Sequence, residues 1–266
     1  MRDIIRTASR IVVKLGSNLF FDGEGKLALD RIAALIEDLA DARVAGRQVL
    51  VVSSGAVALG ANTLHKKQTD AIAQKQAFAA VGQSHLMNLY EQGFSKHGLV
   101  AAQILLTSED FSNPTRFRNL QNTLMALLEM EVIPVINEND TIATEELEVS
   151  NRTFSDNDQL SALVMSRLGA TLLILLTDVD GLLTGSPAED PEAALISEVH
   201  DVTAEIESMA GNKSTRGRGG MATKIRAAGV AMGSGGMAII ANGTRPGVLR
   251  RILSGEPEGT LFVSKS

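Results

Sequence analysis

Lys14 occupies a position that suits contact with a bound anion. It lies within the apolar run Arg10–Leu15 and is followed by Gly16 and Ser17. A buried lysine is costly unless an anion meets it, and glycine lets backbone N–H groups approach that anion. We therefore predict that this strand end contacts phosphate. The alternative is a lysine that reaches solvent from a sheet edge, and the run is not a GxxxxGK[ST] loop.

A second lysine, Lys224, ends a glycine-rich run that leads into a predicted helix. The run 217–224 contains Arg218, Gly219, Gly220, Met221, Ala222 and Thr223. Free amides at the start of a helix attract anions. A lysine in the first helical turn opposes the helix dipole, so a purely structural role is disfavoured. The run predicts a phosphate-binding loop, with a mobile surface loop as the alternative.

Two clusters of polar side chains follow a predicted strand and begin a predicted helix. They contain Asn137 and Asp140, then Asp156, Asn157 and Asp158. Their oxygens can accept hydrogen bonds from an ammonium group, and their carboxylates can orient lysines. Acidic helix caps explain either cluster alone but hardly both.

Small polar residues follow two further predicted strands. The run 53–56 includes Ser54 and Gly55, where backbone N–H groups at a helix start can bind an anion. An ordinary helix N-cap is the alternative. Thr177 and Asp178 follow another apolar strand and suit contact with ribose or phosphate, although a turn explains them equally well.

Together these residues favour phosphoryl transfer. Lys14 and Lys224 supply positive charge, and Asp158 is available to hold both. This reaction needs positioning and charge neutralisation, because charge spreads over the phosphoryl oxygens in the transition state. A carboxylate acceptor is ionised at neutral pH and needs no general base. The sequence has no cysteine, and its four histidines are scattered without metal-ligand spacing.

The elements that must position these residues alternate between strands and helices. Strands are predicted at 10–15, 48–52, 99–106, 132–136, 171–176 and, as the last core strand, 237–241. Helices are predicted at 27–45, 71–95 with a break near Gly82, 116–130, 158–168 and 221–232. This order is typical of the α/β class, with an open, mostly parallel sheet between helices on both faces. Ligands bind at the carboxyl ends of such strands, where the polar residues fall.

Two segments interrupt the alternation, and the charge is unevenly distributed. Segments 138–155 and 181–212 are long enough for functional loops or hairpins. Residues 208–255 hold eight Lys or Arg and no Asp or Glu, whereas 129–158 hold nine carboxylates and one Arg. One interpretation of this uneven charge is a basic region that binds a polyanion beside an acidic region that binds a cation. The alternative is two differently solvated faces.

The composition also excludes some partners. The net charge of -6 argues against nucleic acid as a partner. No apolar run reaches the length of a membrane span, and the N-terminus lacks a signal-peptide pattern. We therefore expect a cytoplasmic protein that does not bind a membrane.

Ten short motifs resemble those of the amino acid kinase family. They are VVKLGS (12–17), SSGAVALG (53–60), AAVGQ (79–83), LLT (105–107), PVINENDT (134–141), DNDQLSA (156–162), LLTDVDGLLT (175–184), GRGGMATK (217–224), NGTRPG (242–247) and GTLF (259–262). The resemblance covers nearly the whole chain. KLG, TDxxGL and GGMxTK mark the wider family, whereas PVINENDT with DNDQLSA resembles the members that phosphorylate the side-chain carboxylate of glutamate.

The resemblance implies transfer of a phosphoryl group from ATP, with Mg²⁺, to glutamate as the first step of proline synthesis. Lys14 and Lys224 would stabilise the transferred group, and Asp158 would orient both lysines. The amino-acid site would contain Ser54, Gly55, Asn137, Asp140, Asp156 and Asn157. The nucleotide site would contain Lys14, Gly16, Ser17, Thr177, Asp178, Arg218, Gly219, Gly220, Met221, Ala222, Thr223 and Lys224. No residue is expected to ligate a metal.

The resemblance also implies an organisation and a regulation. It predicts one domain over residues 1–266, with a substrate half at about 1–170 and an ATP half at about 171–266. Proline would inhibit at or near the glutamate site. The protein would form a homo-oligomer, either a dimer or a tetramer.

Three features depart from the family pattern. The chain ends directly after GTLF, so we expect it to lack the C-terminal PUA domain that many relatives carry. Residues 150–154 resemble an insertion in the loop that would close over glutamate. Leu183 and Ser186 stand where tyrosine and aspartate are common, which alters the expected adenine contacts. Arg218 stands where threonine is common.

Two alternative functions remain. The chain can be a family member that acts on aspartate, acetylglutamate, carbamate or a nucleotide, but the PVINENDT and DNDQLSA pair argues against this. It can also be a non-catalytic sensor on the same scaffold. Retention of Lys14, Asp158 and Lys224 together argues against a sensor.

Overall fold

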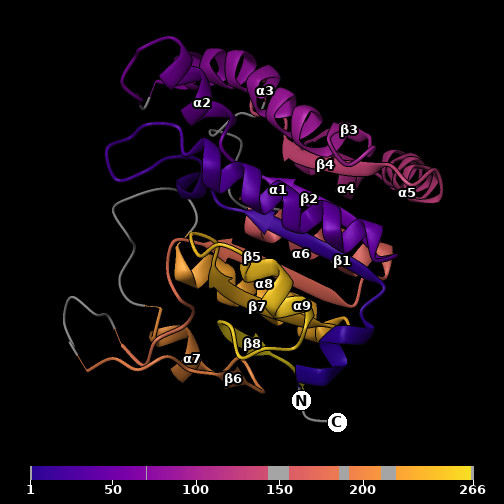
Figure 1. Ribbon diagram of the computed structural model, residues 1–266, viewed down its shortest axis with the longest axis vertical. Helices are drawn as coiled ribbons and strands as arrows, with labels where there is room; N and C mark the ends of the chain where they lie inside the picture. The colour runs from indigo at the N-terminus through magenta and orange to yellow at the C-terminus, as the bar shows by residue number, and fades with distance from the viewer. Residues whose placement is uncertain (1, 70, 143–155, 186–191, 211–219, 265–266) are drawn as a thin grey trace.

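The computed structural model describes residues 2–69, 71–142, 156–185, 192–210 and 220–264 (Figure 1). Within these ranges the strands form one eight-stranded sheet in the order β3-β4-β2-β1-β5-β7-β8-β6. The strands are β1 Arg10–Leu15, β2 Gln48–Ser53, β3 Ala101–Leu106, β4 Ile133–Glu138, β5 Leu172–Thr177, β6 Glu198–Val199, β7 Met237–Asn242 and β8 Thr260–Phe262. Only the β7–β8 pair is antiparallel among them. The open, mostly parallel α/β fold is confirmed.

Helices cover both faces of this sheet. They are α1 Leu29–Val44, α2 Ala56–Thr63, α3 Ile72–Ser95, α4 Ser108–Ser112, α5 Pro114–Glu129, α6 Asn157–Leu168, α7 Ala204–Ser208, α8 Met221–Gly233 and α9 Val248–Leu253, with 3-10 turns at Arg2–Thr7 and Ser17–Phe20. No helix among the described residues combines the length and apolar character needed to cross a bilayer.

Alternate strand residues face different helical layers. In β1, Val13 packs in the core cluster shared with α1, α3 and α9. Val12 packs in the opposite cluster, shared with α5, α6 and α8. Successive side chains of a strand point to opposite faces. Lys14 therefore lies on the same face as Val12, beneath α6 and α8.

The carboxyl ends of the parallel strands meet at one edge of the sheet. In Figure 1 the strands run with these ends toward the left of the view. Helix α6 begins after an aspartate cap and ends at Gly169, whose φ of 63° suits glycine. Helix α5 begins at Pro114 after an Asn113 cap. These caps start α5 and α6 close to the polar residues at the strand ends.

The prediction of 237–241 as the last core strand is wrong. Strand β8 follows it and pairs antiparallel with β7, and β6 pairs with β8. Both strands have three residues or fewer, too few to show an alternating pattern. The interrupting segment 181–212 contains β6 and α7, and a bridge joins Leu183 to Leu195. Residues 143–155 of the other segment, with the insertion at 150–154, lie outside the described residues, as does Ser186.

The predicted break near Gly82 is also wrong, because α3 is continuous from Ile72 to Ser95. A Cβ on Gly82 would lie 1.8 Å from the carbonyl oxygen of Ala56, and one on Gly60 would lie 1.8 Å from that of Phe78. The backbones of α2 and α3 are thus in direct contact. Gly82 allows this close approach rather than interrupting its helix.

Candidate active site

Lys14 and Lys224 contact the two oxygens of one buried carboxylate, Asp158. Nζ of Lys14 lies 2.6 Å from Oδ1, and Nζ of Lys224 lies 3.1 Å from Oδ2. Lys14 comes from the end of β1, Asp158 from the first turn of α6 and Lys224 from the first turns of α8. Because β1 lies beneath α6 and α8, strand alternation alone directs Lys14 toward the other two residues.

These three charges are almost completely removed from solvent. Lys14 and Lys224 are 5% and 4% exposed, and Asp158 is 0% exposed. Two lysines and one carboxylate leave an excess of one positive charge. The buried carboxylate of Asp156 also acts on both lysines, but burial raises its pKa, which weakens that compensation. Because a buried charge without a counter-ion is costly, this cluster suits an anion.

Burial and charge oppose each other at this cluster. Burial acts to raise the pKa of Asp158, but the charges of Lys14 and Lys224 outweigh it and lower the pKa to about 2. Burial lowers the pKa of Lys224, and the carboxylate of Asp158 opposes that effect. The carboxylate is therefore ionised at neutral pH and can hold both lysines.

The start of α8 supplies a third contact with Asp158. Oγ1 of Thr223 lies 2.7 Å from Oδ2 of Asp158 and 2.8 Å from the carbonyl oxygen of Gly220. Gly220 is the N-cap residue, and within the described part of the chain no side chain caps this helix. Its first amides thus remain available to an anion. Arg218 and Gly219 lie outside the described residues.

A partly buried chain of amides lies at the ends of β2 and β4. Nδ2 of Asn157 donates to Oγ of Ser54 at 2.8 Å and to Oδ1 of Asn137 at 2.9 Å. Nδ2 of Asn137 donates in turn to Oε1 of Gln83 on α3 at 3.0 Å. Oδ1 of Asn157 and Nε2 of Gln83 are buried and have no hydrogen-bond partner among the described residues. Such groups offer an acceptor and a donor to a polar ligand or water.

Asp156 caps α6 and keeps one oxygen free. Its Oδ1 accepts hydrogen bonds from the backbone N–H groups of Asp158, at 2.8 Å, and Gln159, at 3.0 Å. Its Oδ2 is buried without a partner among the described residues. Burial, and then the charge of Asp158, raise the pKa of Asp156. A cationic group placed against Oδ2 would stabilise the ionised carboxylate and so lower its pKa again.

Neither serine of the run 53–56 caps α2 with its side chain. The residue at the start of α2 is Gly55, with a φ of 113°, and no described side chain caps the helix. Oγ of Ser53 instead accepts a hydrogen bond from the hydroxyl of Tyr90 at 2.8 Å. Oγ of Ser54 accepts from Asn157, as described above. Both hydroxyls are thus used in building the site.

Thr177 and Asp178 lie at the end of β5, next to β1 in the sheet. Oδ1 of Asp178 accepts from Oγ1 of Thr177 at 3.1 Å, and Oδ2 accepts from Nδ2 of Asn18 at 2.9 Å. The N–H of Gly16 donates to the carbonyl oxygen of Leu176 at 3.2 Å. These contacts join the two strand ends that flank Lys14. Ser17 begins the 3-10 turn that carries Asn18.

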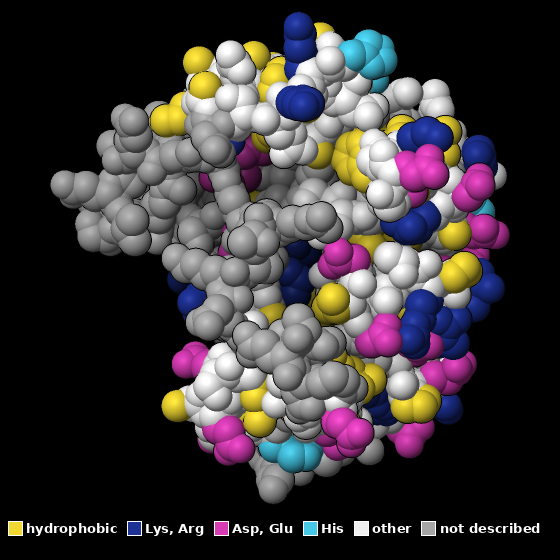
Figure 2. Space-filling model, turned by 90° about the vertical axis from the view of Figure 1, so that its left-hand side faces the viewer, with side chains coloured by type: hydrophobic (Ala, Val, Ile, Leu, Met, Phe, Trp, Pro, Cys, Tyr) yellow, Lys and Arg dark blue, Asp and Glu magenta, His cyan; other side chains and the backbone are white. Residues whose placement is uncertain are grey.

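The predicted residues fall into two groups in space. One joins Lys14, Asp158, Thr223 and Lys224 with the start of α8, and the other joins Ser54, Asn137 and Asn157 at the neighbouring strand ends. Asp140 lies two residues beyond β4 and is partly buried. Figure 2 shows a hollow on the face at the carboxyl ends of the strands, with Lys or Arg side chains visible in it.

Sequence reasoning gave no role to Gln83 or Asn18. Gln83 ends the AAVGQ motif in a helix whose spacing does not distinguish it from a surface glutamine. Asn18 directly follows Gly16 and Ser17, which were predicted to contact phosphate, and this neighbourhood could have indicated that Asn18 lies in the site. Lys14 was the buried charged residue of β1, since Arg10 at the start of the strand is only partly buried.

Comparisons with known proteins agree with this geometry. The model of the amino acid kinase family matches residues 9–242. A protein of Trichlorobacter lovleyi named glutamate 5-kinase is 47% identical over 264 residues, which cover 98% of this chain and 69% of that protein. Another glutamate 5-kinase, of Listeria innocua, is 42% identical over 267 residues, with 100% of this chain and 96% of that protein covered.

A solved structure shows the same fold. Carbamate kinase from Giardia lamblia bound to AMP-PNP superposes with a TM-score of 0.67 at 16% identity, covering 98% of this chain and 100% of that chain. At this level of identity the likeness concerns the fold alone.

Proposed function

The chain belongs to the amino acid kinase family, and we infer that it transfers the γ-phosphoryl group of ATP to the side-chain carboxylate of L-glutamate. It is a phosphotransferase, and its product is glutamyl 5-phosphate in proline biosynthesis. The observation that carries the inference is the buried cluster of Lys14, Asp158 and Lys224, whose excess positive charge suits a phosphoryl group.

The proposed chemistry needs no proton transfer. A carboxylate oxygen of glutamate attacks the γ-phosphorus, the bond to the β,γ-bridging oxygen breaks, and ADP leaves with that electron pair. Lys14 and Lys224 neutralise charge on the phosphoryl oxygens in the transition state. Asp158 contacts both lysines and Thr223, and it acts as the residue that positions the lysines. The glutamate carboxylate is ionised at neutral pH, so a general base is unnecessary.

We assign the amide chain to the amino acid. Ser54, Gly55, Asn137, Asp140 and Asn157 are the proposed contacts of glutamate. The free Oδ2 atom of Asp156 is the proposed acceptor for the ammonium group. This assignment places a carboxylate beside the ammonium group and leaves the side-chain carboxylate free to face the lysines.

We assign the residues around the lysine cluster, the end of β5 and the start of α8 to ATP with Mg²⁺. The proposed contacts are Lys14, Gly16, Ser17, Thr177, Asp178, Arg218, Gly219, Gly220, Met221, Ala222, Thr223 and Lys224. Among the described residues, no three His, Asp or Glu side chains gather closely enough to hold a metal ion. Mg²⁺ bound with a nucleotide is typically held by phosphate oxygens, water and one or two carboxylates, and it would shield charge on the phosphates.

Four further properties belong to the same proposal. The half up to about residue 170 would carry the amino-acid site together with Lys14, Gly16 and Ser17, and the half after it would carry the rest of the nucleotide site. Proline would inhibit by competing at or near the glutamate site. The chain would assemble as a dimer or tetramer, measurable by light scattering. A cytoplasmic location would suit an enzyme that consumes ATP and glutamate.

The experiment that tests the proposal is ADP release from Mg-ATP by the purified protein. Glutamate is compared with aspartate, acetylglutamate and UMP, each with and without proline. We expect turnover with glutamate only, and suppression of that turnover by proline. Turnover with another acceptor would refute the substrate, and tight ATP binding without turnover would support a sensor instead.

A further inference from the structure

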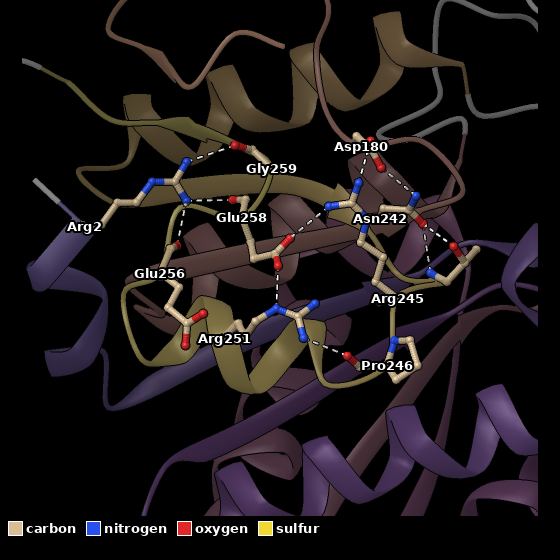
Figure 3. Close-up of polar contacts among 10 residues, drawn as sticks. Arg2, Asp180, Asn242, Arg245, Pro246, Arg251, Glu256, Glu258 and Gly259 are labelled. Carbon is tan, nitrogen blue, oxygen red and sulfur yellow. Dashed lines mark hydrogen bonds and ion pairs between the residues drawn. The ribbon is translucent and has the colours of Figure 1, made fainter.

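A second polar network lies beside the nucleotide side of the site and has no part in the chemistry above. Oδ1 of Asp180 accepts from Nδ2 of Asn242 at 2.8 Å, and Oδ2 pairs with Nη2 of Arg245 at 2.7 Å (Figure 3). Asn242 is the last residue of β7, and its Oδ1 accepts from the backbone N–H of Thr244 at 2.9 Å. Asp180 thereby ties the segment after β5 to the end of β7.

The network continues toward β8 and α9. Nη1 of Arg245 lies 3.7 Å from Oε2 of Glu258, whose Oε1 pairs with Arg251 of α9. Arg251 also donates to the carbonyl oxygen of Pro246 at 2.8 Å (Figure 3). Charges therefore alternate along the chain of contacts from Asp180 to Arg251. The NGTRPG motif is joined in this way to the residues that lead into β8.

Backbone contacts hold the same segment on a second side. The N–H of Leu182 donates to Oγ1 of Thr260 at 2.8 Å, and that of Gly243 donates to the carbonyl oxygen of Thr177 at 2.7 Å. Gly181 has a φ of 152°, and a Cβ there would lie 2.7 Å from Oγ1 of Thr260. Segment 177–182 is thus fixed against both β7 and β8.

We infer that Asp180, Arg245 and Glu258 are positioning residues for the nucleotide. They fix segment 177–182, and this determines where Thr177 and Asp178 meet ATP. The inference rests on the proposed function in that it takes these two residues as ATP contacts. No hydrogen bond or ion pair links the three positioning residues to the amide chain in the part of the chain that the structure describes. Their loss should therefore affect ATP and leave glutamate binding unchanged.

The test uses the purified full chain with Arg245→Gln, Asp180→Asn and the double substitution. Arg245 and Asp180 have side chains 50% and 44% exposed, so we expect about a fivefold rise in the KM for ATP, near the upper range for such pairs. The Kd of a non-hydrolysable ATP analogue should rise equally. The double variant should bind ATP no worse than either single variant, because the two residues act as a unit. Arg245→Lys should restore part of the affinity.

Arg250→Gln is the matched control. Arg250 lies in α9, is 62% exposed and pairs with Asp41 at 2.7 Å and with Asp38 at 3.4 Å, both of α1, instead of the segment after β5. This substitution removes two ion pairs on another face and should leave both KM values within twofold of the original.

The inference is overturned by equal rises in the KM for ATP and glutamate, by additive losses in the double variant, or by a similar effect of Arg250→Gln. A lower melting temperature with unchanged ATP affinity overturns it as well, since the network would then be structural only. Failure of the proposed function is a separate result. In that case the original chain releases no ADP with glutamate, while binding of the ATP analogue to the variants still decides the inference.

Discussion

Nζ of Lys14 lies 2.6 Å from Oδ1 of Asp158, although the two residues are 144 positions apart in the chain. Both side chains are almost wholly buried. The pair stabilises the fold above the unfolded pKa of aspartate, near 4, and this contribution is lost as the pH falls through the folded pKa of about 2. The contact holds the side chain of Lys14 in place, so the lysine needs little reorganisation to meet a phosphoryl group.

Removal of either lysine should reduce catalysis much more than substrate binding. We expect Lys14→Ala and Lys224→Ala each to lower kcat by about 10²-fold or more, because each removes one donor of positive charge to the transition state. Steady-state kinetics measure this, and thermal melting checks folding. Lys26→Ala is the control, since Lys26 is an exposed lysine that pairs with Glu24. Near-normal kcat in either test variant would contradict the role.

Gln83→Met should weaken glutamate binding by loosening Asn137. The substitution keeps the length of the side chain but removes the acceptor that Nδ2 of Asn137 uses. A buried donor left without its partner costs ~1–3 kcal/mol, so we expect a rise of about tenfold in the KM for glutamate. The KM for ATP should stay constant. Gln92→Met is the control on the same helix, because Gln92 is exposed and its side chain donates to Asn88 at the helix surface. Equal effects of the two substitutions would refute the prediction.

Asp156→Asn should stabilise the protein at neutral pH and weaken glutamate binding. Asparagine caps a helix as well as aspartate does, and it removes a charge whose pKa is raised by burial and by Asp158. A carboxylate with a raised pKa contributes fully below its unfolded pKa near 4 and loses that contribution as the pH rises through its folded pKa.

The gain in melting temperature should therefore appear at pH 7 and shrink toward pH 4. A gain of ~1 kcal/mol corresponds to about 2–4 °C. The KM for glutamate should rise, because the ammonium group loses its proposed acceptor. The exposed Asp201→Asn should change neither property, and a lower melting temperature of Asp156→Asn at pH 7 would disprove the expectation.

Gly82→Ala should destabilise the fold strongly. Its Cβ would meet the backbone of α2 at 1.8 Å, and overpacking of this kind costs ~1–3 kcal/mol or more. Gly233→Ala is the matched control, because Gly233 also lies in a helix and its Cβ would meet nothing within 4 Å. Chemical denaturation measures both. Similar midpoints for the two variants would show that α2 and α3 can separate without cost.

Continuous apolar runs and helical apolar spacing predicted most of the strands and helices. The strands at β1, β2, β4, β5 and β7 are buried on both faces, so their runs of Val, Ile and Leu leave little ambiguity. The antiparallel strand β8 could not be found in this way, because its three residues carry too little pattern. Gly82 was misread for another reason, since a glycine that breaks a helix and one that allows close packing look alike in sequence.

The site was predictable where charge conflicted with burial. Lys14 in an apolar strand required a partner, and the polar runs after β4 and before α6 supplied candidates. Gln83 could not be found, because a glutamine in a helix has no such conflict until its burial is known. The Asp180–Arg245 contact joins residues far apart in the chain, and only the neighbouring positions of β5 and β7 in the sheet bring them together.

Strand β1 is central in the finished sheet but is an edge strand in the growing chain. Ile11 pairs with Val49 of β2 and with Leu172 of β5. At ribosomal rates the second partner emerges about ten to thirty seconds after β1. An unpaired apolar edge is a template for association with other chains, and a lysine on such an edge discourages it. Until β5 and Asp158 have been made, Lys14 gives β1 that charge, and we expect the residue proposed for catalysis also to discourage association of the nascent chain.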